Sequence, residues 1–318
     1  MTTGHLARIV GPDPRKTWGR HKHLRAAIRA HPITAFLVLL FAGTWLLFVP
    51  ALLGQSGLGV FGYDFPREPG LLLAVFAIMG AGPILITGIA EGRDAAKQLA
   101  SRIINLRAGP QWYLLAIVGV PAIMLVVAVI LHGAAAFTPF AESWAQLPGN
   151  YLLPLIIAAV LVNICEEMAW MAFLTDRWQQ RFGPLRASLG VAPLFGLLHL
   201  PLFFIVGGLA DGRLALSEFP QYVVLLLVVA TVPVRILVTW VYNATGKSLP
   251  LTAIFHQSID LTAGAFMLTT FYPGINGLLL YGGLAVAAVI VTIATRGRLG
   301  LPEAHPVIAP LVASPVAV

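Results

Sequence analysis

Apolar stretches long enough to cross a membrane repeat along most of this 318-residue chain. A helix needs about 20 mainly apolar residues to cross the roughly 30 Å hydrocarbon core of a bilayer. Eight stretches qualify, and they predict an all-α polytopic membrane helix bundle of about eight transmembrane helices. The predicted spans are 33–53, 71–90, 112–132, 151–174, 187–206, 220–242, 249–270 and 277–295. The seventh is the least regular, because a histidine and an aspartate interrupt it.

Two polar segments flank the predicted bundle, which occupies residues 33–298. Residues 1–32 form a basic leader. Because this leader is long, the first apolar span begins too late to belong to a cleavable signal peptide. Part of it, residues 15–31, either forms a helix on the anionic cytoplasmic membrane surface or is a disordered segment that only sets orientation. Residues 299–318 are rich in proline and alanine and are predicted to be a flexible tail.

Composition supports a membrane protein and argues against a nucleic-acid-binding one. Hydrophobic residues make up 58% of the chain and charged residues only 10%, whereas an average soluble domain has roughly 25% charged residues. The net charge of +7 is therefore informative through the positions of the basic residues along the chain. The single cysteine, Cys165, excludes an internal disulfide.

Basic residues alternate between the segments that connect the predicted spans. The leader holds seven Lys or Arg, and segments 91–111 and 175–186 hold four and three. The intervening segments 54–70 and 133–150 hold one and none. Because short cytoplasmic loops are enriched in Lys and Arg, both termini are predicted to be cytoplasmic. We expect an integral protein of a bacterial cytoplasmic membrane, in contact with lipids and not with nucleic acid.

A few polar side chains lie inside the predicted spans, where an ionisable group costs several kcal/mol, from about 2.5 upward. Such groups normally face the bundle interior and have a function, although structural hydrogen bonds between helices are the alternative. They are concentrated in spans four to seven. They are Asn163, Glu166, Glu167, His199, Arg235, His256 and Asp260.

These groups are predicted to converge between the cytoplasmic half and the middle of the bilayer. If span four ends at residue 174, Glu166 lies about eight residues, or roughly 12 Å, from its cytoplasmic end. By the same estimate His199 lies roughly 18 Å and His256 roughly 10 Å deep. Phe195 shares a helix face with His199, and His256 shares one with Asp260, because each pair is four residues apart.

Three motifs follow one another in these spans: EEMAWM at 166–171, FGLLH at 195–199 and HQSID at 256–260. Together they resemble the CPBP family of CAAX proteases and bacteriocin-processing enzymes, also called the Abi family. That family has a double Glu with an Arg four residues after the second Glu, then Phe-x-x-x-His, then His-x-x-x-Asn or Asp. The segment from EGRD to GPQWY, 91–113, resembles the loop before its core. The resemblance covers about residues 91–270, a protease-like core.

The resemblance implies an intramembrane, metal-independent glutamic endopeptidase that acts on a peptide or protein and uses no cofactor. Glu166 would be the general base that activates water, and His199 would orient that water. His256 and Asp260 would support the oxyanion. The chemistry is reasonable in lipid, because hydrogen-bond donors aimed at a developing oxyanion act more strongly there than in water.

The chain departs from the family pattern at one position, since Met171 replaces the expected Arg. That Arg would lie on the same helix face as Glu167 and could pair with it. Arg235 has about the same predicted depth, so we hypothesise that it replaces the missing Arg from another helix. The alternative is that Arg235 snorkels to the cytoplasmic interface.

Asp260 fits the family pattern but raises an electrostatic problem. An ionised carboxylate would repel an oxyanion, so Asp260 must either be protonated and donate, or act by orienting His256. We favour the second role. The candidate site is then Glu166, Glu167, His199, His256 and Asp260, supported by Phe195, Arg235 and Asn163.

Other functions remain open from the sequence. His199, His256 and Glu166 could form a zinc site between helices, although the chain contains no His-Glu-x-x-His. A serine protease is disfavoured because Ser258 lies on nearly the opposite helix face from His256. The main alternative is a non-catalytic scaffold or bacteriocin-immunity protein of the same family with a degenerate site, and a transporter is a further one. The sequence predicts neither the substrate's identity nor the oligomeric state.

Overall fold

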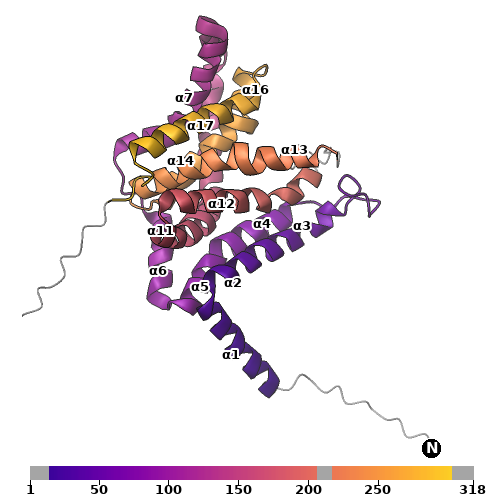
Figure 1. Ribbon diagram of the computed structural model, residues 1–318. Coiled ribbons are helices and arrows are strands. Elements are labelled where there is room, and N and C mark those ends of the chain that lie inside the picture. Colours follow the sequence, from indigo (N-terminus) through magenta and orange to yellow (C-terminus); the bar gives the residue numbers. More distant parts are fainter. Residues whose placement is uncertain (1–13, 206–216, 303–318) are drawn as a thin grey trace, which may run out of the picture.

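A computed structural model describes residues 14–205 and 217–302, which are helical throughout apart from short turns and loops (Figure 1). Residues 1–13 of the predicted leader and residues 303–318 of the predicted tail lie outside the described residues. In the described part, seven helices are long and apolar enough to cross a membrane. They are Pro32–Leu52, Glu68–Ala90, Pro110–Gln146, Pro148–Phe182, Pro184–Phe204, Phe219–Ala244 and Gly277–Ala294.

Most of these long helices are built from α-helical segments joined by π-helical or 3₁₀ turns. The α-helical segments are α1 (Pro14–Ala30), α2 (Pro32–Val38), α3 (Thr44–Leu52), α4 (Glu68–Leu73), α5 (Gly82–Ala90), α6 (Arg93–Ser101), α7 (Pro110–His132), α8 (Thr138–Ser143), α9 (Leu153–Ala158), α10 (Ile164–Glu167), α11 (Asp176–Phe182), α12 (Pro184–Leu198), α13 (Phe219–Val224), α14 (Thr231–Ala244), α15 (Leu249–Asp260), α16 (Met267–Phe271) and α17 (Gly277–Ala294). The π-helical segments are Leu39–Gly43, Ala74–Ala81, Pro148–Leu152, Ala159–Asn163, Met168–Thr175, Leu225–Ala230 and Leu261–Ala265.

The stretch predicted as the seventh span, 249–270, differs from the others. It forms α15 and the π-helical turn Leu261–Ala265, breaks at Phe266, and resumes as the short α16. The uninterrupted helix is therefore shorter than the seven crossing helices, although α15 packs against both α7 and α14 inside the bundle. The all-helical fold is confirmed, and seven of the eight predicted spans are found as full-length helices.

Local sequence signals explain where the helices of the core begin. Proline occupies the first position of α7 and α12, where its missing N–H breaks no helical hydrogen bond. Gly183 precedes α12 with φ of +80°, a conformation that suits a residue without Cβ. Ser248 caps α15 by accepting a hydrogen bond from the Leu251 N–H. These signals set the start of the two helices that carry the predicted histidines.

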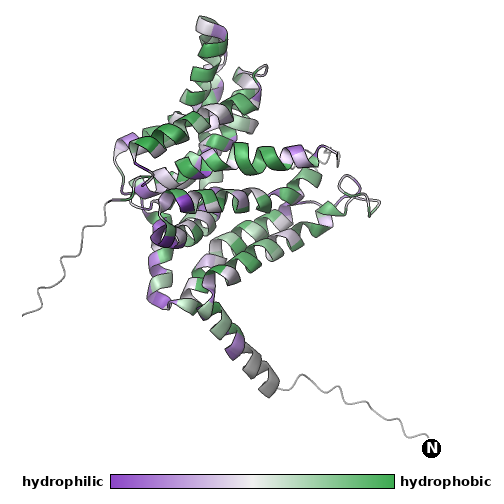
Figure 2. Cartoon of the chain, viewed as in Figure 1, coloured by the Kyte–Doolittle hydropathy of each residue, from purple (hydrophilic) through white to green (hydrophobic). Residues whose placement is uncertain are grey.

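The bundle has two chemically different ends. At the first, which we call the basic end, the α5–α6 and α11–α12 connections meet the last turns of α14 and α17. Two contacts connect segments at this end: Arg102 pairs with Asp176, and the Asn243 side chain donates to the Leu299 carbonyl. Hydrophilic colouring is dense at α6 and α11 in Figure 2. The opposite end carries the loop between α3 and α4, the end of α12 and the start of α13, where Phe204 and Phe219 pack together.

Candidate active site

A buried ion pair lies at the centre of the bundle. The Arg235 guanidinium of α14 makes a bidentate contact with the Glu167 carboxylate at the end of α10, with Nη1–Oε1 and Nη2–Oε2 distances of 2.9 Å each. Both side chains are fully buried, so Arg235 does not extend to an interface. Two parallel N–H···O bonds fix the orientation of both groups.

His256 of α15 lies between carboxylates. Its Nδ1 atom is 2.7 Å from Glu167 Oε1 and 3.8 Å from Glu166 Oε2. Its Nε2 atom is 4.0 Å from Asp260 Oδ1, one helical turn further along. The imidazole is buried, and the carboxylate closest to it is the one that Arg235 also binds.

His199 directly follows α12 and has a defined proton arrangement. Its Nδ1 atom lies 2.7 Å from the Phe195 carbonyl oxygen. Because a carbonyl oxygen can only accept, Nδ1 must carry the proton, and in the neutral ring Nε2 is then an acceptor. The neighbouring backbone is also held, since the Trp45 indole N–H donates to the Leu198 carbonyl at 3.1 Å.

Phe195 packs against several of the polar groups. Its ring centroid lies 4.7 Å from that of His199 and 5.6 Å from that of His256, and the Arg235 guanidinium carbon lies 4.8 Å from the ring centre. Trp170 contacts the same ring edge-on. An aromatic ring at position 195 therefore sets the spacing of both histidines and attracts the cation through its π face.

A cavity of about 630 Å³ opens on one side of this cluster. Glu166 and Asp260 face it with side chains that are 15% and 51% exposed, whereas Glu167 lies behind them without exposure. Asn163 donates to Asp260 Oδ2 at 3.4 Å, and its Oδ1 atom has no hydrogen-bond partner. The cavity is lined by Asn163, Glu166, Phe195, His199, His256 and Asp260 among others.

All eight residues of the predicted site are thus brought together, and the helix that carries Glu166 is longer than predicted. The estimate placed the end of span four at residue 174, whereas the helix continues through α11 to Phe182. Glu166 therefore lies 182 − 166 = 16 residues from the helix end, or roughly 24 Å at 1.5 Å per residue. The site is in the middle of this helix and not close to its end.

The zinc arrangement considered from the sequence has no matching geometry. Within residues 14–205 and 217–302, no group of three or more His, Cys, Asp or Glu side chains could hold a metal ion. His199 uses Nδ1 to donate to a carbonyl, and His256 Nδ1 lies 2.7 Å from Glu167 Oε1. Both histidines are therefore oriented by the protein itself.

Comparison with known proteins finds a family that the segment carrying the site resembles. The family model described as "Type II CAAX prenyl endopeptidase Rce1-like" matches residues 148–262, the segment that contains all eight site residues. This segment is therefore similar to that family. It is also 26% identical over 264 residues to CAAX prenyl protease 2 of the archaeon Methanococcus maripaludis, covering 80% of this chain and 88% of that protein.

The chain differs from the motif that it resembles at Met171, and the structure shows what occupies that region. Met171 is fully buried one turn after Glu167, and its sulfur accepts from the Thr239 hydroxyl at 3.7 Å. The same hydroxyl donates to the Arg235 carbonyl. The guanidinium that pairs with Glu167 therefore comes from α14, next to the side chain that replaces the motif arginine.

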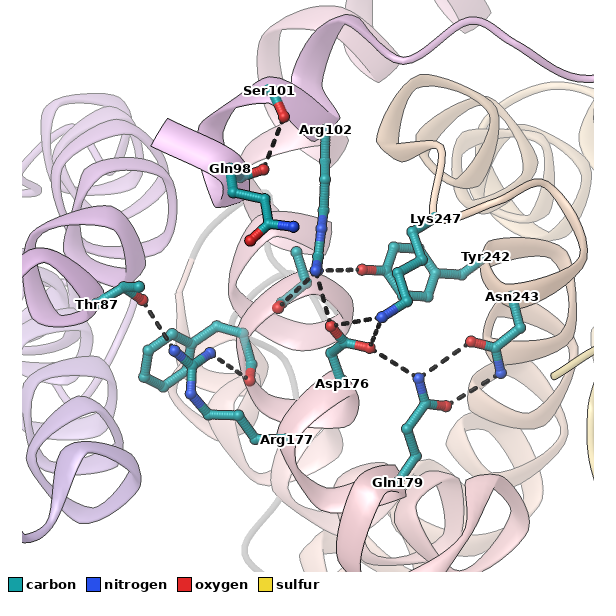
Figure 3. A network of polar contacts seen from close by, with 12 residues as sticks. Thr87, Gln98, Ser101, Arg102, Asp176, Arg177, Gln179, Tyr242, Asn243 and Lys247 are labelled. Atoms are coloured by element: carbon teal, nitrogen blue, oxygen red, sulfur yellow. Dashed lines mark hydrogen bonds and ion pairs between the residues drawn. The ribbon is translucent and has the colours of Figure 1, made fainter. Parts of the chain in front are cut away.

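A second polar network, which was not predicted from the sequence, lies at the basic end of the bundle (Figure 3). Its centre is Asp176, whose side chain is only 6% exposed. The carboxylate lies 2.9 Å from Arg102 Nη2 and 2.7 Å from Lys247 Nζ, and Gln179 donates to it at 2.9 Å. The Gln179 and Asn243 amides also bond each other reciprocally at 3.1 Å.

The network explains how the helices are held at the end furthest from the cavity. It joins the segment after α6 to α11, α14 and the turn before α15. The double-Glu motif and α11 belong to one continuous helix, so fixing Asp176 also limits the rotation of the segment that carries Glu166. The signal in the sequence is the run of polar residues after 174, which hydropathy alone assigns to a connecting segment.

Replacing the central carboxylate should destabilise the protein. We expect Asp176→Asn to lower the free energy of unfolding by about 1–3 kcal/mol, because two cations lose a buried, charged acceptor. Thermal unfolding in detergent measures the effect. Asp94→Asn is the matched control, since Asp94 is fully exposed and its Lys97 contact is 3.8 Å long. Equal melting temperatures for the two variants would contradict the stabilising role of Asp176.

Proposed function

We propose that this protein is an intramembrane, metal-independent glutamic endopeptidase that hydrolyses a peptide bond in the cavity beside Glu166. The observation that carries the proposal is that the two adjacent glutamates have different surroundings. Glu167 is neutralised behind the cavity by Arg235, whereas Glu166 faces the cavity and has no arginine partner among the described contacts. One carboxylate is thus structural, and the other is available to accept a proton.

The proposed reaction begins with a water molecule between Glu166 and His199. Glu166 removes a proton from the water while the His199 Nε2 lone pair accepts a hydrogen bond from it, and the water oxygen attacks the peptide carbonyl carbon. The proton held by Glu166 then passes to the leaving nitrogen as the C–N bond breaks. A positioned base of this kind contributes about 10²–10⁴-fold to the rate.

Oxyanion stabilisation is assigned to His256. In this proposal His256 is doubly protonated, so that Nδ1 donates to Glu167 and Nε2 donates to the developing oxyanion. Asp260 lies beyond Nε2 and orients the ring, supported by the amide of Asn163. Preorganised donors in a site with little water are among the largest contributions to catalysis.

Arg235 takes the role of the family's motif arginine in this proposal. Its bidentate contact holds Glu167, and Glu167 in turn holds His256, so the cation acts two steps away from the substrate.

We further propose that α15 counts as an eighth crossing, which places both termini on the cytoplasmic side of a bacterial membrane. The substrate is a peptide or protein, and CAAX peptides are the class named by the relatives.

Peptide-cleavage profiling in detergent tests the proposed activity. The purified protein should cleave a subset of a diverse peptide library, and Glu166→Ala should abolish every cleavage that the wild type makes. Cleavage should persist after chelation of divalent metals. A scaffold with a degenerate site, which the replacement at Met171 motivates, would instead give no cleavage in either protein. Loss of wild-type cleavage on chelation would favour the zinc alternative.

Replacing Asp260 should have a smaller effect than replacing the general base. Asp260 is half exposed and 4.0 Å from His256, and exposed charge pairs contribute about 0.2–1 kcal/mol. We therefore expect Asp260→Asn to reduce kcat by no more than about fivefold, since 1.36 kcal/mol corresponds to tenfold. Steady-state kinetics measure the change. A variant faster than wild type would show that the charge at position 260 opposes the reaction.

A further inference from the structure

The catalytic cavity extends from the site in one direction only. On the fourth crossing helix, Pro148–Phe182, its lining residues run from Ala158 to Glu166 and none lies beyond Glu166. On the sixth crossing helix, Phe219–Ala244, they run from Leu226 to Val234 and stop before Arg235. Both sets run from near the middle of the helix toward the end that is further from the basic end.

Lining residues of the other helices point the same way. The second crossing helix contributes Leu71, close to its start, and Arg67 lies just before it. Tyr281 belongs to the second turn of α17, and His199 directly follows the last residue of α12. These helix ends all adjoin the opposite end of the bundle. The cavity therefore opens toward the α3–α4 loop and the start of α13.

Tightly packed side chains close the route from the site to the basic end. Trp170 and Met171 follow the double-Glu motif and are fully buried, and Thr239 is fully buried one turn after Arg235. The Ser188 hydroxyl donates to the Thr239 hydroxyl at 2.8 Å across the helix interface. The Asp176 network lies further along the same helices (Figure 3).

The charges of the connecting segments distinguish the two ends. Segments at the basic end contain ten Lys or Arg: Arg93, Lys97, Arg102, Arg107, Arg177, Arg181, Arg186, Lys247, Arg296 and Arg298. In the part of the chain that the structure describes, the segments at the opposite end contain one Lys or Arg, Arg67. Because Lys and Arg are retained on the cytoplasmic side of a membrane, the basic end is cytoplasmic by this rule.

We propose that the substrate reaches Glu166 from the extracytoplasmic side of the membrane. This inference rests on the proposed peptidase activity and specifies the substrate class: a peptide segment exposed at the outer surface, such as the terminus or loop of an exported or membrane-anchored protein. A prenylated C-terminus in the cytoplasm would meet the basic end of the bundle, where packed side chains separate it from Glu166. The substrate proposed here therefore lies on the other side of the membrane.

Cysteine labelling tests the side of access without depending on catalysis. Cys165→Ala removes the single natural thiol, and Leu71→Cys or Ala158→Cys then places one thiol on the cavity wall. Glu142→Cys is the control for the outer end, and Gln98→Cys is the control for the basic end, because both side chains are exposed. The probe is a charged, membrane-impermeant maleimide, applied to intact spheroplasts or to sealed inverted vesicles.

We expect the thiols at positions 71 and 158 to be labelled in spheroplasts together with the thiol at 142, while the thiol at 98 is labelled only in inverted vesicles. Labelling at 71 and 158 only in inverted vesicles would overturn the proposal. So would labelling of the thiol at 142 from the cytoplasmic side, or no labelling at 71 and 158 in spheroplasts that label at 142.

A cleavage assay separates failure of this inference from failure of the proposed function. A quenched fluorescent peptide that is cut in detergent is added outside sealed vesicles of each orientation. Cleavage only in right-side-out vesicles, and its loss in Glu166→Gln, is the expected result. Cleavage only in inverted vesicles overturns the access side and keeps the peptidase. If no peptide is cut in detergent either, the proposed function fails, while the labelling result still decides the access side.

Discussion

Glu166→Gln should reduce kcat/KM by about 10²–10⁴-fold, the usual contribution of a general base, while leaving the melting temperature close to that of the wild type. The amide has the same shape but cannot accept a proton from water. Glu166 is partly exposed to the cavity, and its closest charged contact is His256 at 3.8 Å, so its loss leaves no buried cation without a partner. Initial rates and thermal unfolding in the same detergent measure the two quantities.

Glu167→Gln is the matched comparison, because it makes the same chemical change one residue away. It removes the charge that holds Arg235 at two points and His256 at 2.7 Å. Breaking a buried ion pair costs about 3–5 kcal/mol, so this variant should lose stability as well as activity. If Glu166→Gln proved the less stable variant, the assigned roles of the two glutamates would be reversed.

The helical fold was predictable because each crossing helix is recorded locally, as a run of apolar residues of the right length. The prediction was incomplete at 249–270, where His256, Gln257 and Ser258 interrupt that run and the helix breaks at Phe266. The helix that carries Glu166 extends to Phe182 because buried partners satisfy Asp176. Those partners come from distant segments, so local hydropathy alone ended the predicted helix too early.

The site was predictable to a different extent. Ionisable residues in apolar spans are rare and costly, so they could be found from the sequence and matched to motifs. The contacts between these residues could not be found in this way. Arg235 and Glu167 are 68 residues apart in the sequence, and a similar predicted depth does not determine which side chains pair. The direction in which the cavity opens depends on packing behind the site, to which fully buried residues such as Trp170 and Thr239 contribute.

Arg235→Met should destabilise the protein by about 3–5 kcal/mol, because it leaves the Glu167 carboxylate buried and unpaired. Activity should fall with it, since His256 loses the fixed carboxylate that orients its ring. Arg181→Met is the control, as it makes the same change at an exposed position of the basic end. Melting temperature and kcat are measured together. Wild-type stability and activity in Arg235→Met would refute the idea that Arg235 replaces the motif arginine.

Exchanging the side chains at positions 171 and 235 distinguishes two roles of Arg235: specific replacement of the motif arginine, and general balancing of the Glu167 charge. In Met171→Arg/Arg235→Met, the arginine returns to the position four residues after Glu167, on the same helix face. Thr239 already contacts both sites, through the Met171 sulfur and the Arg235 carbonyl, so the exchanged side chains occupy one shared region. The double variant should recover part of the stability and activity that Arg235→Met loses. Met171→Arg alone should be destabilised, because it places two guanidinium groups beside one carboxylate. A double variant no better than the sum of its single changes would show that position 171 cannot supply the cation in this fold.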